Sequence, residues 1–407
     1  MDPFPEHGLA RDALIDEMRH RKEGDADWRS GRTWSLVYKT GDDEVTGVLE
    51  EAAALYLYEN ALNPAAFPSL RRFEREVVGW TADLLHAPDG AGGSMSSGGT
   101  ESIFLAVQVA RDRARAERGV TEPQVVVPLT AHPAFDKAAH YLDVELVKAP
   151  VRDDLRADPS AVHDLVGDRT VLVVGSAPCY PYGVVDPIPE LAALAADRGI
   201  PCHVDACLGG WVLPFWERLG EPVPPWDFRV EGVTSISADT HKYGYALKGA
   251  STIVHREKAA LRHQMFLVDD WVGGIYGSLT AAGTRPAAPI AAAWAVIRHL
   301  GLDGYLRLTQ VVRDAARALR GGIDALEGLA VLGDPDASTF AFGSDLHDIS
   351  AVGDAMDDKG WHLDRQPDSL HMIVMPGHAA VVAEFLADLA DAVAHHGPAR
   401  GTEARYA

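Results

Sequence analysis

The 407-residue chain has few cysteines, an excess of acidic over basic residues and no long apolar run. Three cysteines are too few for a disulfide framework, and all lie in segments expected to be buried strand ends: Cys179, Cys202 and Cys207. No stretch approaches the roughly 18 to 20 apolar residues that span a bilayer, and the N-terminal segment lacks the apolar core of a signal peptide. We therefore expect a cytoplasmic protein without a membrane span.

The acidic excess also limits the partners of the protein. A formal net charge of −22 repels the phosphates of nucleic acids and of anionic membrane surfaces. The hydrophobic fraction of 47% and the charged fraction of 24% are ordinary for a globular protein. At 407 residues the chain exceeds the size that one hydrophobic core fills, so we expect a large and a small domain and no nucleic-acid partner.

Short β-rich runs alternate with helical patterns through the middle of the chain. Each run is nearly continuous in apolar residues, as buried parallel strands are. Alternation at this spacing is typical of βαβ crossovers and predicts an α/β fold with a mostly parallel sheet. The expected strands are Gln124–Leu129, Val144–Ala149, Thr170–Gly175, Ile200–Val204, Val233–Ser237 and Ser251–His255.

Helical periodicity flanks this region on both sides. Helices are expected at Phe73–Leu85 and Thr100–Arg118, and a long amphipathic helix is expected from Gly304 through Leu326. Short strands and a final helix from His378 complete a compact α+β unit. We therefore divide the chain into an N-terminal segment (1–60), a large domain (61–300), a small C-terminal domain (301–396) and a mobile tail (397–407).

A glycine-rich turn, Ser97-Gly98-Gly99-Thr100-Glu101, opens the helix expected from Thr100. Unpaired backbone N–H groups and the helix dipole favour an anion there, and glycine lets the backbone approach phosphate oxygens. Thr100 adds a hydroxyl donor on the first turn. A plain helix N-cap is the alternative interpretation of this turn.

Three polar residues, Asp205, Lys242 and His132, each follow an expected strand. Open α/β sheets bind ligands at that edge. A carboxylate there suits a protonated pyridine nitrogen, a desolvated lysine is a nucleophile towards an aldehyde, and an imidazole can stack on a ring. Taken singly, a turn residue, a surface lysine and a helix cap are the alternatives. Together with a phosphate cradle, in this order, they match the groups that pyridoxal phosphate (PLP) requires.

Taken together, these segments resemble the group II PLP-dependent decarboxylase superfamily of fold type I and, within it, the sphingosine-1-phosphate lyases. The likeness extends over residues 33–375. The resemblance implies the PLP-dependent transferase fold, with a mostly parallel, seven-stranded sheet in the large domain and a smaller C-terminal α+β domain. The segments that look like the lyases rather than other decarboxylases are Ser97–Ile103, His132–His140, Gly175–Gly183, Asp205–Gly210, Ser235–Gly249 and Ala282–Pro286.

For the cofactor, the resemblance implies that Lys242 forms the Schiff base, Asp205 pairs with the pyridine nitrogen and His132 stacks on the ring. Tyr180 is expected opposite the reacting carbon. No metal is implied. The residues expected to hold the cofactor phosphate are Gly98, Gly99, Thr100 and His241, together with Thr284 from the neighbouring subunit of a homodimer with shared active sites.

For the substrate, the resemblance implies four residues near its phosphate: Tyr38, Asn60, Asn63 and Lys248. Tyr38, like Thr284, is expected to reach the site of the partner subunit. Asn63 stands where the family usually has a histidine, and Leu247 stands where it usually has a proline. The run Trp34-Ser35-Leu36-Val37-Tyr38 replaces the common Ser-Gly-Ala-x-Tyr.

The reaction implied by the resemblance is retro-aldol cleavage of a phosphorylated 2-amino-3-hydroxy compound, such as sphingosine 1-phosphate, to a fatty aldehyde and phosphoethanolamine. A PLP-dependent amino-acid decarboxylase shares the same electron sink and is the first alternative. A catalytically idle binding protein is the second, although the retention of Lys242 and Asp205 argues against it. The expected partner is therefore a small amino-alcohol phosphate or an amino acid.

Overall fold

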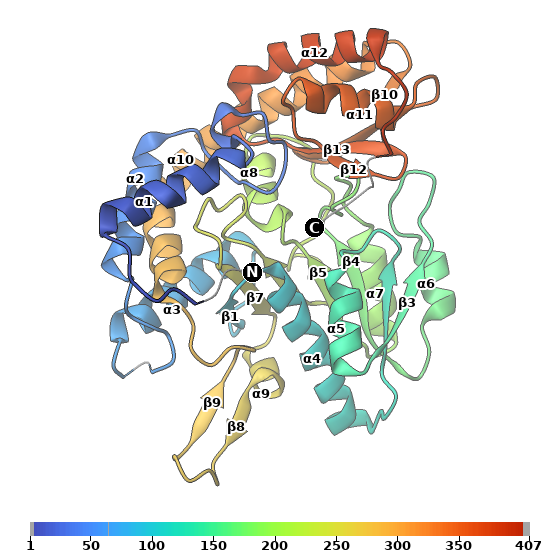
Figure 1. Cartoon of the computed structure of the whole chain (residues 1–407). Coiled ribbons are helices and arrows are strands. Elements are labelled where there is room, and N and C mark those ends of the chain that lie inside the picture. Colours follow the sequence, from blue (N-terminus) through green and yellow to red (C-terminus); the bar gives the residue numbers. More distant parts are fainter. Residues whose placement is uncertain (1–3, 64, 402–407) are drawn as a thin grey trace.

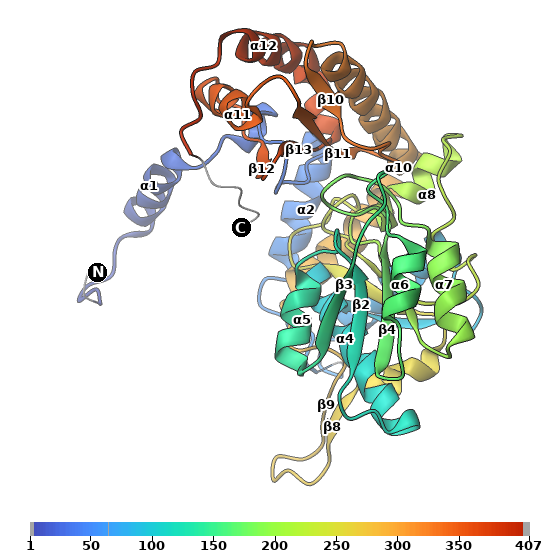
Figure 2. The same cartoon turned by 90° about the vertical axis from the view of Figure 1, so that its right-hand side faces the viewer.

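The computed structural model describes residues 4–63 and 65–401. It consists of a large α/β domain, a smaller α+β domain beside one end of it, and an N-terminal segment whose first helix projects away from both (Figures 1 and 2). The large domain contains a seven-stranded sheet of order β1-β7-β6-β5-β4-β2-β3. Its strands are β1 (Gly92–Ser96), β2 (Gln124–Pro128), β3 (Glu145–Ala149), β4 (Thr170–Ser176), β5 (Cys202–Asp205), β6 (Val233–Ala238) and β7 (Ser251–His255).

Only β7 runs antiparallel to its neighbours, and the rest of the sheet is parallel. The predicted fold, a mostly parallel seven-stranded sheet, is therefore confirmed. Successive side chains of β2 bury on opposite faces: Val125 and Val127 pack with α4 and α5, whereas Val126 belongs to the core on the other side. Because helices cover both faces, the strands need continuous apolar sequence.

The helices of the large domain lie on both sides of this sheet (Figure 2). α4 and α5 share a core with one face, and α7 contacts β4 and β5 from the other. The helices are α3 (Pro68–Leu84), α4 (Gly99–Arg118), α5 (Ala134–Leu142), α6 (Pro159–Leu165), α7 (Ile188–Asp197), α8 (Leu213–Arg218) and α9 (Leu261–Gln264).

The small domain is a four-stranded antiparallel sheet of order β10-β11-β13-β12. Its two helices lie on the side of this sheet that faces away from the large domain (Figure 1). The elements are β10 (Leu329–Val331), β11 (Thr339–Ser344), α11 (Ile349–Asp358), β12 (Asp364–Gln366), β13 (Ser369–Ile373) and α12 (Val382–His395).

The long helix α10 (Ala287–Asp324) connects the two domains and bends at Gly301. Gly301 has a φ of 56°, a backbone conformation that glycine adopts without the steric cost of a side chain. The boundary predicted between residues 300 and 301 falls at this bend, inside an otherwise continuous helix.

The N-terminal segment packs on the small domain through Trp34, which is fully buried. The Trp34 ring lies 4.3 Å from the His378 ring and 4.8 Å from the Phe385 ring, measured between centroids. Its backbone N–H donates to the carbonyl of His362, and its carbonyl accepts from the N–H of Ile373. This segment therefore adds to the small domain before the chain enters the large one.

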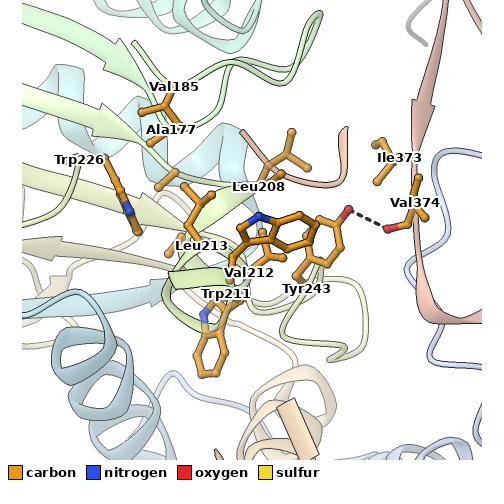
Figure 3. Close-up of a cluster of buried hydrophobic side chains, with 14 of the residues drawn as sticks. Ala177, Val185, Leu208, Trp211, Val212, Leu213, Trp226, Tyr243, Ile373 and Val374 are labelled. Carbon is orange, nitrogen blue, oxygen red and sulfur yellow. Dashed lines mark hydrogen bonds between the residues drawn. The ribbon is translucent and has the colours of Figure 1, made fainter. Parts of the chain in front are cut away.

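A buried cluster that includes Trp211 and Tyr243 lies where the two domains meet (Figure 3). Tyr243 Oη donates to the carbonyl of Val374 at 3.0 Å and accepts from Ser338 Oγ at 2.6 Å. Tyr243 directly follows Lys242, so these bonds fix the lysine-bearing turn to the small domain.

Several elements do not follow the sequence-based pattern. β1 has the sequence Gly-Gly-Ser-Met-Ser, which has low β propensity, and it becomes a strand through its pairing with β7. A projecting hairpin of β8 (Phe266–Val268) and β9 (Tyr276–Ser278) was not expected either. Other unexpected elements are α1 (Arg11–Arg21), α2 (Asp43–Leu55), α9 and β12, and α10 begins at Ala287 rather than at the expected Gly304.

The end of the chain and its apolar helices bear on two further expectations. The tail is described only to Gly401, and within it Arg400 hydrogen-bonds to Asp354 and Asp358. Residues 402–407 lie outside the described part of the chain. Within residues 4–63 and 65–401, no helix is both long and apolar enough to cross a bilayer.

Gly183 provides a test of the loop after β4, which carries Tyr180. Its φ is 71°, and a Cβ at this position would lie 1.7 Å from the carbonyl oxygen of Thr339. Gly183→Ala should therefore lower the free energy of unfolding through two effects. The left-handed backbone conformation costs about 1 to 2 kcal/mol with a side chain present, and overpacking against Thr339 costs about 1 to 3 kcal/mol more. Gly199→Ala is the matched control, because its φ is 64° and no described atom lies within 4 Å of the added Cβ. Thermal denaturation should show a larger decrease in Tm for Gly183→Ala than for Gly199→Ala, and equal decreases in Tm would contradict this account.

Candidate active site

A cavity of about 280 Å³ opens at the carboxyl edge of the large sheet. The loops after β1, β2, β4, β5 and β6 all form its wall, because these strands end at the same edge. Most of the residues predicted for the site line this one cavity: Gly98, Gly99, Thr100, His132, Tyr180, Asp205, His241 and Lys242.

The glycine-rich turn lies between β1 and α4, and the first residues of α4 face the cavity. A Cβ on Gly99 would lie 2.8 Å from Asp239 Oδ2, so a side chain would not fit there. Glu101 fixes the turn by accepting hydrogen bonds from Ser97 N at 2.6 Å and from Ala281 N at 2.7 Å. Backbone donors at the start of a long helix suit a phosphate group.

Asp205 is the last residue of β5 and is buried. Its Oδ1 accepts hydrogen bonds from Cys207 N at 3.1 Å and from Ser237 Oγ at 3.2 Å. Both donors are neutral, and a buried carboxylate is stabilised most by a cation. Asp205 is therefore suited to hold a proton on a ring nitrogen of a ligand.

Lys242 lies in the turn after β6 and pairs with Asp239, with Nζ 2.9 Å from Oδ2. Asp239 is 1% exposed and also lies 3.6 Å from His241 Nε2. Burial disfavours the ammonium form of Lys242, but the attraction of Asp239 outweighs it and raises the pKa of Lys242 well above its ordinary value. The amine therefore keeps its proton while it faces Asp239.

Asp239 is the site residue that sequence reasoning did not select. It begins the run Asp239-Thr240-His241-Lys242, so an acidic side chain directly after a strand and three residues before the lysine was the available signal. Burial raises the pKa of Asp239, but Lys242 and His241 reverse this effect and hold the pKa below its ordinary value. Asp239 thus remains ionised beside the lysine.

The two histidines of the cavity are held in one tautomer by backbone donors. His132 Nδ1 accepts from Ala134 N at 3.0 Å, and the ring also lines the cavity. His132 therefore both caps the start of α5 and forms part of the cavity wall. His241 Nδ1 accepts from Ala250 N at 3.3 Å. Burial lowers the pKa of both histidines despite nearby carboxylates. Each neutral ring therefore has its proton on Nε2.

Tyr38 and Lys248 lie beside the cavity rather than in its wall. Lys248 Nζ lies 4.3 Å from the centroid of the Tyr38 ring, and that ring packs on Tyr243 at 5.8 Å between centroids. Lys248 is exposed, yet desolvation by the surrounding protein and the charge of Lys242 lower its pKa to about 8. These contacts lie within one chain, so Tyr38 lies beside the cavity of its own chain, and its expected reach into the partner's site stays a prediction.

Asn60, Asn63 and Thr284 do not reach the cavity of their own chain. Asn60 Oδ1 accepts from Leu62 N at 3.1 Å, and Asn63 Oδ1 accepts from Ala65 N at 3.0 Å. Both asparagines thus stabilise turns through their own backbone neighbours. Thr284 is exposed on the surface.

Comparisons with known proteins agree with this geometry. The pyridoxal-dependent decarboxylase conserved domain matches residues 5–343. A sphingosine-1-phosphate lyase from Arabidopsis thaliana is 43% identical over 98% of this chain and 75% of its own length. The solved structure of a sphingosine-1-phosphate lyase from Burkholderia pseudomallei has a TM-score of 0.94 at 44% identity, over 97% of this chain and 93% of that one. A probable L-aspartate decarboxylase from Pyrococcus abyssi is 34% identical over 96% of this chain and 99% of its own length.

The residues present in the cavity fit PLP. The glycine backbone of Gly98 and Gly99, which line the cavity, and the start of α4 suit the phosphate. Asp205 suits the ring nitrogen, and Lys242 provides a primary amine. In the part of the chain that the structure describes, no three His, Cys, Asp or Glu side chains gather to hold a metal ion.

The role of Lys242 can be tested by trapping the cofactor. Borohydride reduction of the purified holoprotein should fix the mass of PLP on the peptide that contains Lys242, because this amine lies in the cavity wall. Lys248 is the natural reference, because it lies nearby but outside the wall. Peptide mass spectrometry distinguishes the two lysines, and an adduct on Lys248 alone would refute the assignment.

Proposed function

We propose that this chain, which belongs to the pyridoxal-dependent decarboxylase family, cleaves a carbon–carbon bond of a phosphorylated 2-amino-3-hydroxy substrate such as sphingosine 1-phosphate. Its family makes it a PLP-dependent lyase. The products would be a fatty aldehyde and phosphoethanolamine. The observation that supports this substrate most directly is Lys248, a second cation beside the Lys242 cavity and available for a second phosphate.

The residues that would hold PLP follow from the cavity wall. Lys242 would bind it covalently, Asp205 would keep its ring nitrogen protonated, and His241 would lie beside its phosphate. His132 would pack on the ring. When bound, PLP supplies an electron sink for the pair that is released at the substrate Cα. A charge pair such as that of Asp205 contributes on the order of 4 kcal/mol at about 4 Å and an effective dielectric of about 20.

Lys242 and Asp239 would also control a proton during the reaction. The Nζ of Lys242 lies 2.9 Å from Asp239 Oδ2, and the two would pair whenever this amine is not bonded to the cofactor. The carboxylate favours the ammonium form, so Lys242 would act as the acid that returns a proton to Cα after bond cleavage. Asp239 would thereby keep this proton donor charged.

An amino-acid decarboxylase is the second candidate, and the Pyrococcus abyssi relative supports it. Both reactions break a bond at Cα and use the same electron sink. They differ in the bond that is aligned and in the products. An assay of the purified protein with sphingosine 1-phosphate and with a panel of amino acids separates them: aldehyde release supports the lyase, and carbon dioxide release without aldehyde supports the decarboxylase.

We also propose a homodimer in which Thr284 completes the cofactor phosphate site of the partner. Its exposed position outside its own cavity supports this proposal. A second support is α1, which projects from the body of the chain and buries none of its residues (Figure 2). An isolated helix of 11 residues is marginal in water, and exposed apolar residues on and beside it, such as Leu9, Leu14 and Met18, suit a partner surface.

A cytoplasmic location is part of the same proposal. The three cysteines are buried as free thiols. Burial raises the pKa of Cys179 and Cys202 to about 12, which keeps both as unreactive thiols. Free thiols of this kind are typical of a reducing compartment.

Lys248 gives the sharpest test of the phosphorylated substrate. Lys248→Ala should reduce kcat/KM for sphingosine 1-phosphate about ten- to a hundredfold, as expected for a lost hydrogen bond to a charged group. The cofactor absorption should be unchanged, because Lys248 lies outside the cavity wall.

The pH dependence provides an independent readout of the same residue. The ammonium form binds a phosphate, and the pKa of Lys248 is lowered to about 8. The KM of the wild-type protein should therefore rise as the pH passes this value, and Lys248→Gln should lack this rise. Lys39→Ala, which removes a lysine that packs on Trp28, is the control. Unchanged kinetics of Lys248→Ala would contradict the proposed phosphate contact.

Shared active sites predict complementation between two inactive chains. Lys242→Ala lacks the reactive amine, and Thr284→Ala lacks the hydroxyl offered to the partner. Mixed dimers of these two variants should regain part of the activity, because one of their sites has both residues intact. Thr284→Ser keeps the hydroxyl and should remain active on its own. Verified heterodimers without any recovered activity would argue against a shared site.

A further inference from the structure

A polar network joins Tyr180, in the cavity wall, to the small domain. Tyr180 Oη donates a hydrogen bond to Asp364 Oδ2 at 2.5 Å. His371 Nδ1 lies 3.2 Å from the same oxygen, and Ser35 Oγ donates to Asp364 Oδ1 at 2.5 Å. Asp364 and His371 are opposite each other on β12 and β13, and Ser35 comes from the N-terminal segment. Three separate parts of the chain thus meet at one carboxylate.

The surroundings of Asp364 favour its role as a fixed acceptor. Its side chain is 17% exposed, and that of His371 is fully buried. The Tyr180 ring packs on the His371 ring at 4.3 Å between centroids. Burial raises the pKa of Asp364, but hydrogen bonds from His371, Ser35 and Tyr180 lower it below its ordinary value. The carboxylate therefore stays ionised and keeps accepting the phenol proton.

Because Tyr180 donates its phenol proton to Asp364, this hydrogen bond determines how Tyr180 can bind a ligand. A tyrosine hydroxyl has a single proton, and here Asp364 accepts it. Any further polar group that meets Tyr180 Oη must therefore donate to it. In the substrate class proposed above, the 3-hydroxyl is such a donor, and it is the group whose proton must leave for cleavage to occur.

We propose that Asp364 is a positioning residue that turns Tyr180 into a hydrogen-bond acceptor for the 3-hydroxyl of the substrate, and thereby selects 3-hydroxy amines over their 3-deoxy counterparts. This inference rests on the proposed function. His371 supports the arrangement by packing on the Tyr180 ring and by sharing the Asp364 oxygen. Tyr180 would touch the substrate, whereas Asp364 and His371 would act through it.

Binding by the holoenzyme provides the test. The apparent Kd of dihydrosphingosine 1-phosphate and that of its 3-deoxy analogue are measured by rapid mixing, from the change in cofactor absorption. Wild-type protein should prefer the hydroxyl compound by about fivefold, which corresponds to the central value of about 1 kcal/mol for one neutral hydrogen bond. Asp364→Ala and Tyr180→Phe should each abolish this preference and change the Kd of the 3-deoxy analogue less than about twofold. The double variant should be no worse than either single variant.

Two matched variants separate positioning from general damage to the domain contact. Asp364→Asn keeps an oxygen that can accept the phenol proton, so it should retain most of the preference. Gln366→Ala removes a neighbouring contact of β12 with the same loop, in which Gln366 Nε2 donates to the carbonyl of Pro181 at 3.0 Å, and it should leave the preference intact. If Asp364→Ala does not fold, Tyr180→Phe alone decides the point, because it leaves the carboxylate in place.

The outcomes distinguish this inference from the proposed function. Three results would overturn the inference. The wild-type protein could bind the two amines equally, or the variants could weaken the binding of both amines to the same extent. The third result is a double variant in which the losses of affinity of the two single variants add up. If the wild-type protein discriminates between the amines but releases no aldehyde from the hydroxyl compound, the proposed function is wrong while the acceptor role of Tyr180 stands. If it releases aldehyde without discriminating between the amines, the proposed function stands and the acceptor role of Tyr180 is wrong.

Discussion

The parallel direction of β2, β4, β5 and β6 is the constraint on which the rest of the molecule depends. Parallel strands leave all their carboxyl ends at one edge, so residues far apart in the chain meet there. For this reason one cavity is lined by residues at or just after the ends of four different strands: His132, Tyr180, Asp205 and Lys242. Helices must cover both faces of such a sheet, and α4, one of them, also brings its N-terminus to the cavity.

Within this cavity, the placement of opposite charges decides the chemistry that is available. Lys242 would lose proton affinity by burial alone, but Asp239 restores it, and the same lysine keeps Asp239 ionised. Desolvation and the charge of Lys242 both lower the pKa of Lys248, and the weaker attraction of Asp239 does not offset them. The two lysines, six positions apart in the chain, thus have opposite pKa shifts and suit different roles.

The small domain contributes to the site through two tyrosines rather than through residues of its own in the cavity wall. Tyr243 ties the lysine-bearing turn to Val374 and Ser338. Tyr180 ties the loop after β4 to Asp364 on β12. The position of Gly183, where no side chain fits beside Thr339, keeps this loop in close contact with β11. A movement of the small domain would therefore be transmitted directly to the cavity.

The strand pattern, the mostly parallel sheet and the set of residues at its carboxyl edge could all be predicted from the sequence, because buried parallel strands and glycine-rich helix starts have local signatures. β1 could not, since its Gly-Gly-Ser-Met-Ser run becomes a strand only by pairing with β7. Neither Asp239 nor the contact of Tyr180 with Asp364 was selected. Asp239 is distinguished by an ion pair, and Asp364 by three hydrogen bonds from residues at least seven positions away. These roles depend on the folded chain, because a carboxylate has the same local sequence signal on a surface as in a buried network, and its partners come from distant parts of the chain.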